Sequence, residues 1–287
     1  TDVLRRAGAS LAELKSASGV RVQHLSAEVS EQRARERELS SELRAALDGQ
    51  QIEILFQPQV SVTTGQIAGV EALARWQHPR HGMLGAATLF AVAEQSDYVG
   101  ALSNHIQQRA IAAAAGWPEP LAGLRMSVNV TAEDILVPGF ADRFFDMVDS
   151  LAFPRERLTV ELTETGLIAD LARASELLSK LRAGRCRVAI DDFGTGYSSL
   201  AYLKALPLDY LKIDQRLSAD ITGSSRDRIV VRGVIDMARS LGLGVIAEGV
   251  ETHEQLTLLA REGCNYYQGF LFSGPVTTEE LVRLSGA

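Results

Sequence analysis

From about residue 48 onward, short runs in which apolar and polar residues alternate are separated by longer amphipathic stretches. The alternating runs predict strands, and the stretches with a period of three to four residues predict helices. The predicted strands are 53–60, 67–75, 125–130, 157–163, 186–191, 209–213, 244–248 and 265–268. The predicted helices are 86–95, 101–115, 139–150, 170–183, 225–241, 252–261 and 278–284. Repeated strand–helix units over roughly 240 residues indicate an α/β fold, either a closed TIM-type (β/α)8 barrel or an open doubly wound sheet.

The first two predicted strands, 53–60 and 67–75, are joined by Thr63-Thr64-Gly65 instead of a helix. A short link with a glycine is typical of a hairpin. If the sheet closes into a barrel, that barrel therefore begins irregularly.

Residues 1–47 have a different pattern, without proline and rich in Glu, Arg, Ala, Ser and Leu. They predict one or two helices, with one over 22–47. Leucines lie at multiples of seven in this segment, at Leu4, Leu11, Leu25 and Leu39. The segment is either a helix that pairs with a second copy of itself in a homodimer or a solvated linker helix. We therefore divide the chain into a helical linker, 1–47, and a domain, 48–287.

Composition and charge exclude several classes of protein. The chain has 287 residues, 46% of them hydrophobic, which is enough for the core of one large globular domain. No apolar run approaches the ~18 residues of a membrane span. The two cysteines, Cys186 and Cys264, lie alone in apolar contexts, so we expect reduced core residues in a cytoplasmic protein. The net charge of −7 argues against DNA or RNA polymers as partners.

The chain begins at Thr1 without a methionine. We therefore expect a piece of a longer protein, with any sensor, regulatory domain or membrane anchor upstream.

An acidic pair, Asp191-Asp192, follows the apolar run at 186–190. In Asp191-Asp192-Phe193-Gly194-Thr195-Gly196 the two carboxylates lead into a Gly-x-Gly loop. If Val188 and Ile190 face outer helices, the alternation of a strand turns Asp191 the other way, and Asp192 starts the loop. The alternative is a solvated strand end followed by a glycine turn.

The same alternation places polar residues late in other predicted strands, opposite the apolar face. These residues are Glu71, Asn129, Glu161, Asp191, Lys212 and Glu248. In a barrel they converge on the carboxyl end, where barrel enzymes build their sites. Crowded carboxylates without paired histidines or thiolates suit hard cations, Mg²⁺ or Mn²⁺, rather than zinc. Asp191 and Asp192 could serve two neighbouring ions, the usual device for in-line attack on a phosphodiester.

Glu71-Ala72-Leu73, followed by Arg75, resembles the signature of the EAL-domain cyclic di-GMP phosphodiesterases. Further motifs of that family occur in order: Ser127-Val128-Asn129-Val130, Glu161-Leu162-Thr163-Glu164, Asp191-Asp192-Phe193-Gly194-Thr195-Gly196, Lys212-Ile213-Asp214, Ala247-Glu248-Gly249-Val250-Glu251 and Gln268-Gly269. The resemblance covers about residue 48 to the C-terminus. It implies a modified barrel that opens cyclic di-GMP to linear pGpG with two ions of Mg²⁺ or Mn²⁺.

The resemblance also implies roles for individual residues. Glu71, Asn129, Glu161 and Asp191 would hold one metal, and Asp191 and Asp192 would serve the second. Lys212 would lie by the attacking water, and Glu248 is the leading general-base candidate, although water activated by metals needs no separate base. Gln57, Arg75 and Gln268 would contact the nucleotide, with Arg75 facing phosphate. Glu164 and Glu251 would anchor the 191–196 loop, which in the family lies near the dimer contact.

Some of these residues also have ordinary structural explanations. Glu71 and Glu161 could be barrel-mouth acids paired with a lysine or arginine. Asn129 could cap a turn, and Glu251 could begin the next helix. The chain also departs from the usual family pattern at Ala86-Ala87, at Gln215-Arg216-Leu217 and at Gly274, positions of the nucleotide wall or of packing. The alternative to an enzyme is a receptor module that binds cyclic di-GMP without cleaving it.

Overall fold

The computed structural model describes residues 27–286, except 50, 165, 167–169 and 195–199. The strands are β1 (Ile52–Ser61), β2 (Ile67–His78), β3 (Gly82–Gly85), β4 (Arg125–Val130), β5 (Leu158–Thr163), β6 (Arg187–Phe193), β7 (Tyr210–Ile213), β8 (Gly244–Ala247) and β9 (Tyr266–Tyr267). The helices are α2 (Ala27–Asp48), α3 (Ala86–Ser96), α4 (Val99–Ala115), α5 (Ala132–Leu136), α6 (Phe140–Ser150), α8 (Leu171–Ala183), α9 (Leu200–Ala205), α10 (Gln215–Ala219), α11 (Ser225–Ser240), α12 (His253–Glu262) and α13 (Thr278–Ser285). Within this described part, no helix is long and apolar enough to cross a membrane.

Eight of the described strands close into a barrel, as the sequence predicted. Their order is β1-β9-β8-β7-β6-β5-β4-β2, and β1 also pairs with β2. β2 and β4 through β9 run parallel, whereas β1 is antiparallel to both of its neighbours. The predicted hairpin of β1 and β2 is the cause, because a tight turn reverses the chain. The barrel is therefore of the TIM type with an irregular first strand.

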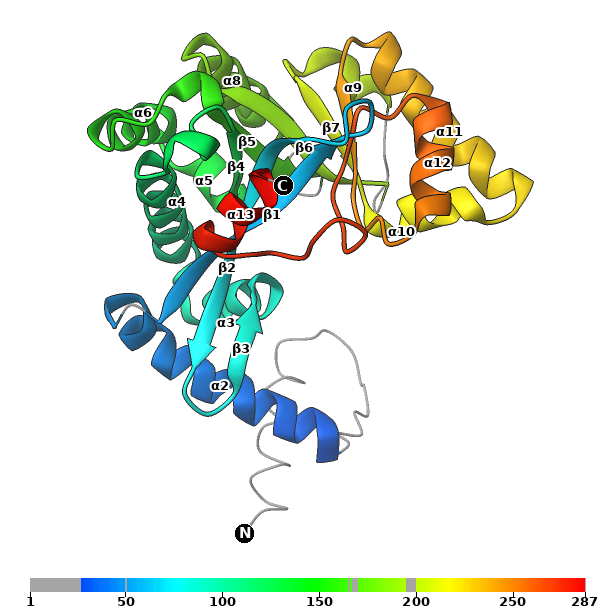
Figure 1. The fold of residues 1–287 in the computed structure, drawn as a ribbon. Helices are drawn as coiled ribbons and strands as arrows, with labels where there is room; N and C mark the ends of the chain where they lie inside the picture. Colours follow the sequence, from blue (N-terminus) through cyan, green and yellow to red (C-terminus); the bar gives the residue numbers. More distant parts are fainter. Residues whose placement is uncertain (1–26, 50, 165, 167–169, 195–199, 287) are drawn as a thin grey trace, which may run out of the picture.

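Apolar residues pack on both faces of the barrel wall. Val160, Val188 and Ile190 face outward and belong to the large core between strands and helices. Figure 1 shows α4, α5, α6 and α8 along one side of the barrel and α11 and α12 along the other. Inside the barrel the apolar cluster is small and consists of Ala189, Tyr210 and Ile246. Most of the remaining interior is available to polar side chains.

A separate lobe lies below the barrel in Figure 1, built from α2, α3, β3 and the end of β2. Leu39 and Leu43 of α2 are 1% and 0% exposed and pack with Trp76 of β2. The lobe is also held by polar contacts, because His78 Nε2 donates to Glu42 Oε2 at 2.6 Å. This packing crosses the domain boundary predicted at residue 48.

The heptad leucine Leu39 is thus used inside this chain, while Leu4, Leu11 and Leu25 lie outside the described residues. Pairing of this segment with a second copy stays a prediction.

The end of β6 differs from the prediction. Asp192 was expected to start the loop, but β6 continues to Phe193. Asp192 has φ of 56°, in the left-handed region, and the pairing with β7 shifts between Ile190 and Phe193. A bulge of this kind re-aims side chains at the rim of a barrel. The short elements β3, α5, α9 and α10 were also not predicted, since a few residues carry too little periodicity.

Candidate active site

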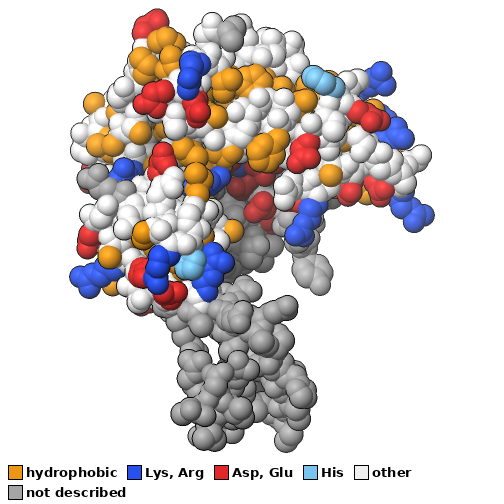
Figure 2. All heavy atoms as spheres, turned by 60° about the horizontal axis from the view of Figure 1, so that its bottom comes forward, with side chains coloured by type: hydrophobic (Ala, Val, Ile, Leu, Met, Phe, Trp, Pro, Cys, Tyr) orange, Lys and Arg blue, Asp and Glu red, His pale blue; other side chains and the backbone are white. Residues whose placement is uncertain are grey.

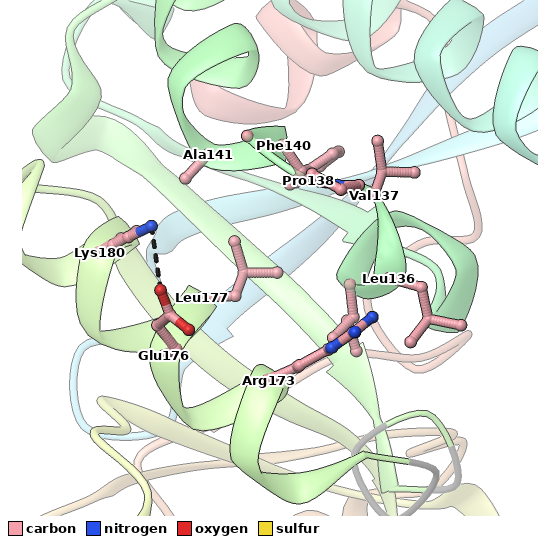
Figure 3. Close-up of a pocket in the computed structure, with 11 residues that line it drawn as sticks. Leu136, Val137, Pro138, Phe140, Ala141, Arg173, Glu176, Leu177 and Lys180 are labelled. Atoms are coloured by element: carbon pink, nitrogen blue, oxygen red, sulfur yellow. Dashed lines mark ion pairs between the residues drawn. The ribbon is translucent and has the colours of Figure 1, made fainter.

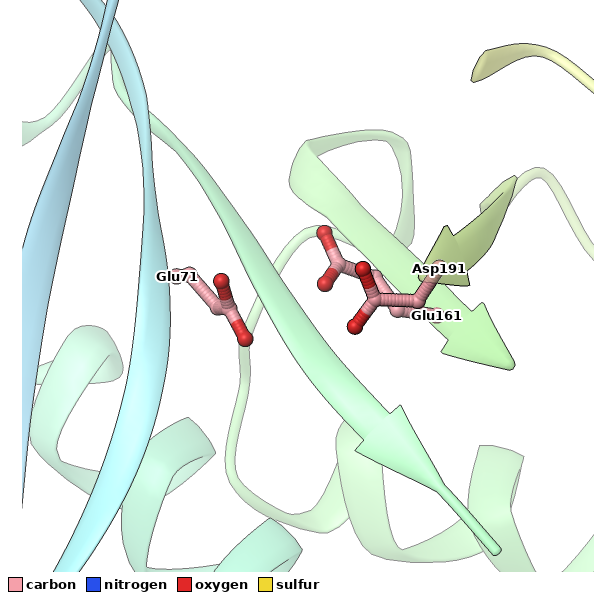
Figure 4. Close-up of side chains that lie close together, drawn as sticks. All are labelled: Glu71, Glu161 and Asp191. Carbon is pink, nitrogen blue, oxygen red and sulfur yellow. The ribbon is translucent and has the colours of Figure 1, made fainter. Parts of the chain in front are cut away.

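Acidic side chains from separate strands meet at the carboxyl end of the barrel. Glu71 lies on β2, Glu161 on β5 and Asp191 on β6, and each points inward because it alternates with outward-facing apolar residues. Figure 4 shows the carboxylates of Glu161 and Asp191 lying together, with Glu71 directed toward them from its own strand. Figure 2, which brings the lower side of Figure 1 forward, shows acidic side chains in a hollow near the centre of the described surface.

Lys212 on β7 lies in the middle of this cluster and is 0% exposed. Its Nζ is 3.0 Å from Glu71 Oε2, 2.6 Å from Glu161 Oε2, 2.9 Å from Asp191 Oδ1 and 2.7 Å from Glu248 Oε1. Burial disfavours the charge on Lys212, but the four carboxylates outweigh it and hold the pKa of the ammonium well above its ordinary value. Lys212 is therefore a buried cation that holds the acids together.

The cluster has more negative than positive charge. Glu71, Glu161, Asp191 and Glu248 surround Lys212, and Asp192 adjoins Asp191. Five ionised carboxylates and one ammonium would leave a formal charge of −4, which two divalent cations would balance. A buried surplus of this size either binds protons or recruits cations.

The carboxyl pKa values reflect this surplus. Burial raises the pKa of Glu161 to about 8, with further contributions from the charges of Glu71 and Asp191. Burial, followed by the charge of Asp191, raises the pKa of Asp192 to about 6. Glu71 is the exception: burial opposes its ionisation, but Lys212 and a hydrogen bond from Gln268 lower its pKa. The acids thus differ in how readily they ionise without a metal.

The geometry fits metal ions. Carboxylate oxygens of Glu71, Glu161 and Asp191 lie within 4.8 Å of one another, as do those of Asp191, Asp192 and Glu248. Asp191 belongs to both sets, which agrees with a shared ligand. Oε1 of Glu161 is buried without a hydrogen-bond partner, and such an atom normally has one. An all-oxygen set with an unsatisfied buried oxygen suits Mg²⁺ or Mn²⁺.

Two amide side chains donate to Glu71, and a third is bonded to one of them. Asn129 Nδ2 donates to Glu71 Oε1 at 3.0 Å, and Gln268 Nε2 donates to Glu71 Oε2 at 2.8 Å. Gln268 Nε2 also donates to Gln57 Oε1 at 3.1 Å, while Gln57 Nε2 donates to the carbonyl of Ser273. The predicted nucleotide contacts Gln57 and Gln268 are therefore linked to the predicted metal ligand Glu71.

Sequence reasoning missed the support behind Asn129. Gln107 of α4 donates to the backbone carbonyl of Asn129 at 3.1 Å and to Ser103 Oγ at 2.9 Å. Ser103 in turn donates to Asp134 Oδ2 at 2.6 Å. Both α4 residues are 1% exposed. The available signal was two polar residues four apart on the apolar face of a helix.

Arg75 lies four residues after Glu71 on β2, so its side chain points to the same, inward face of the strand. It is half-buried, and its Nη1 donates to the carbonyl of Ala74 at 2.8 Å. Burial lowers its pKa, and the charge of Glu71 partly restores it. Two residues after Gln268, Phe270 is 73% exposed, and a Cβ at Gly274 would lie 2.9 Å from its ring. The departure from the family pattern at Gly274 thus makes room for an exposed aromatic ring.

The two predicted loop anchors, Glu164 and Glu251, lie in different surroundings. Glu164 is 1% exposed, and its Oε2 accepts a hydrogen bond from the Gly194 N–H at 3.2 Å, at the start of the loop. Glu251 is exposed and precedes Thr252, the N-cap of α12. Its backbone N–H donates to Gln255 Oε1 at 2.8 Å, which is part of a helix-start arrangement. Residues 195–199 of the loop lie outside the described part of the chain.

Known proteins resemble this chain over most of its length. A family profile described as the EAL domain matches residues 40–275. The chain is 35% identical over 288 residues to the cyclic di-GMP phosphodiesterase NbdA of Pseudomonas aeruginosa, which covers 98% of this chain and 36% of NbdA. An uncharacterized protein of Mycobacterium tuberculosis is 34% identical over 291 residues, covering 100% of this chain and 46% of that protein. The chain thus spans less than half the length of these curated relatives.

Solved structures share the fold. The PaMucR phosphodiesterase in complex with c-di-GMP has a TM-score of 0.80 at 34% identity, covering 85% of this chain and 99% of that one. The EAL domain of DcpA from Mycobacterium smegmatis has a TM-score of 0.70 at 31% identity, covering 82% of this chain and 97% of that one. With a matching profile across residues 40–275 and this barrel, the chain belongs to the EAL domain family.

Proposed function

We propose that this chain hydrolyses cyclic di-GMP to linear pGpG in a reaction that depends on Mg²⁺ or Mn²⁺. The observation that carries the proposal is the cluster of acids around Lys212, whose surplus of negative charge matches two divalent ions. The related NbdA is named a cyclic di-GMP phosphodiesterase, and the similar PaMucR structure contains c-di-GMP. These relatives support the substrate.

Glu71, Asn129, Glu161 and Asp191 would hold one ion, and Asp191 and Asp192 would serve the second. Bound divalent ions lower the pKa of water and stabilise charge on a phosphodiester. Asn129 would supply a neutral oxygen with its amide turned, and Gln107 donates to its backbone carbonyl. The paired sets that share Asp191 support this division of ligands.

The remaining site residues would act on water and nucleotide. Lys212 would orient the attacking water and stabilise its deprotonated form, because its ammonium stays charged among the acids. Glu248 would accept the proton, since burial raises its pKa well above the ordinary carboxyl value. Arg75 would bind phosphate, and Gln57 and Gln268 would contact the nucleotide. Glu164 would hold the loop at Gly194, with Glu251 as the second anchor.

The chain would be the cytoplasmic output domain of a larger signalling protein. Its relatives are more than twice as long, which supports an additional regulatory region. We also propose a homodimer, with the 191–196 loop near the contact between copies.

The test is incubation of the purified chain with cyclic di-GMP and Mg²⁺ or Mn²⁺, with and without EDTA, followed by chromatography. We expect pGpG with either metal and none with EDTA. Calorimetric binding should be measured in parallel. Binding without cleavage would refute the enzyme and favour the receptor. Cleavage of other cyclic or linear phosphodiesters at a higher rate would refute the assignment of the substrate.

A further inference from the structure

A second hollow lies at the opposite end of the barrel from the acids. It is lined by the ends of α8 and α9, by the loops 206–209 and 241–243, and by the first residues of β6, β7 and β8, which are Arg187, Tyr210 and Gly244. The hollow encloses about 510 Å³, within the size range of small-molecule sites. Arg187 and Asp191 are four residues apart on β6, so the two ends are separated by about 13 Å.

The accessible part of this hollow is basic. Arg182, Arg187 and Lys204 line it and are exposed. Its leucines Leu203, Leu206, Leu208 and Leu243 are buried, and Leu241 at its edge is 40% exposed. Asp209, the one carboxylate among the described lining residues, already has partners: Oδ1 accepts from Arg182 Nη2 at 3.1 Å, and Oδ2 accepts from the Val188 N–H at 2.9 Å. Among the residues that the structure describes, Arg187 and Lys204 have no carboxylate within 4.0 Å.

A further arginine contacts Tyr210, one of the residues that line the hollow. Arg125 donates to the hydroxyl of Tyr210, and its Cζ lies 5.2 Å from the Tyr210 ring centroid. Arg187 approaches the same ring at 6.0 Å. In the described part of the chain Arg125 also has no carboxylate partner. Among the described residues, three cations and one carboxylate thus line the hollow, and Arg125 contacts its lining residue Tyr210, in a chain whose net charge is −7.

A third hollow serves as a contrast. It encloses about 260 Å³ between α5, α6 and α8, and Figure 3 shows Glu176 and Lys180 paired across its edge. Their atoms are 3.1 Å apart, and Arg173 pairs with Asp170 at 3.4 Å. Its cations are therefore already neutralised, unlike Arg187 and Lys204 of the basic hollow.

We propose that the basic hollow binds a small anion that carries several phosphates, such as a nucleoside triphosphate or an inorganic polyphosphate. Guanidinium and ammonium groups without partners are the groups that bind phosphate oxygens. The concave shape, the exposed cations and the burial of most of the described lining leucines favour a small polar ligand over an apolar peptide segment. The site is independent of the proposed hydrolysis, since it shares no residue with the acidic cluster.

The test is calorimetric titration of the purified chain with tripolyphosphate, ATP and GTP in EDTA and 150 mM KCl. Without divalent ions the acidic cluster repels anions, so binding there does not contribute. We expect saturable binding to the wild type. The double variant Arg187→Glu/Lys204→Glu should raise Kd by at least about tenfold. Arg226→Glu/Arg228→Glu on α11 is the matched control, because it makes the same change of charge at exposed positions about 20 Å along the helix from Leu241.

Each outcome decides the proposal. Equal affinity for tripolyphosphate and the nucleotides would support recognition of phosphate alone. Tighter binding of the nucleotides would support the site and indicate an additional contact to the nucleoside. No saturable binding, or equal loss in the control variant, would overturn the site. If circular dichroism shows that the double variant does not fold, Lys204→Gln and Arg187→Gln give the same comparison without charge reversal.

Discussion

Replacing Lys212 by methionine should strongly destabilise the metal-free protein. The ammonium is 0% exposed and contacts Glu71, Glu161, Asp191 and Glu248 at 2.6 to 3.0 Å. Methionine keeps most of the volume but leaves these acids without their common cation. Removing one partner of a buried ion pair costs about 3–5 kcal/mol. With an m-value of about 3 kcal/mol/M, the urea midpoint should fall by about 1 M or more.

The assay is urea unfolding followed by circular dichroism, in EDTA and in excess Mg²⁺. Lys180→Met is the matched control, because Lys180 is exposed and pairs with Glu176 on one helix turn, which stabilises by about 0.3–0.5 kcal/mol. Mg²⁺ at 100 times its Kd should raise the free energy of unfolding of Lys212→Met by about 2.7 kcal/mol, because the bound ions neutralise the acids in place of the lysine. If both variants unfold at the wild-type midpoint in EDTA, Lys212 does not hold the acids together.

Three further predictions concern separate parts of the chain. Glu71→Ala should reduce cleavage of cyclic di-GMP by more than about a hundredfold and lower the melting temperature less than Lys212→Met does, measured by chromatography and calorimetry; an unchanged rate would contradict its role. His78→Ala should lower the free energy of unfolding by about 1–3 kcal/mol, because the buried ring and its hydrogen bond to Glu42 are lost, whereas exposed His253→Ala should not; equal urea midpoints would refute this. Burial raises the pKa of Cys186 and Cys264 to about 12, so thiol labelling at pH 8 should be about a thousandfold slower in the folded protein than in urea, and rapid labelling of the native protein would contradict their burial.

The direction of each inward side chain could be predicted from the sequence, because alternation along a strand is a local property. It identified Glu71, Glu161, Asp191 and Lys212 as residues of the barrel interior. It could not show that Lys212 contacts all of these acids at once. Glu71 and Lys212 are 141 residues apart, and their contact depends on how the barrel closes. The sequence therefore indicated the composition of the cluster and not its centre.

The parts that were not predicted depend on what covers a surface or how a chain bends. The leucine pattern around Leu39 showed that one face of a helix is apolar, but not that Trp76 covers it. Asp192 is tolerated in the left-handed region, yet nothing in its neighbours requires φ of 56°. That conformation is fixed by the pairing of β6 with β7, which the local sequence does not encode.

The cluster of acids also explains why removing an acid and removing the lysine should have different consequences. The described apolar cluster inside the barrel is small, with Ala189, Tyr210 and Ile246, and the main core lies between the strands and the helices. Loss of Glu71 reduces the formal surplus from −4 to −3 and leaves that core intact. Loss of Lys212 increases the surplus to −5 in the same buried volume. The barrel should therefore tolerate the loss of one metal ligand better than the loss of its only central cation among the described residues.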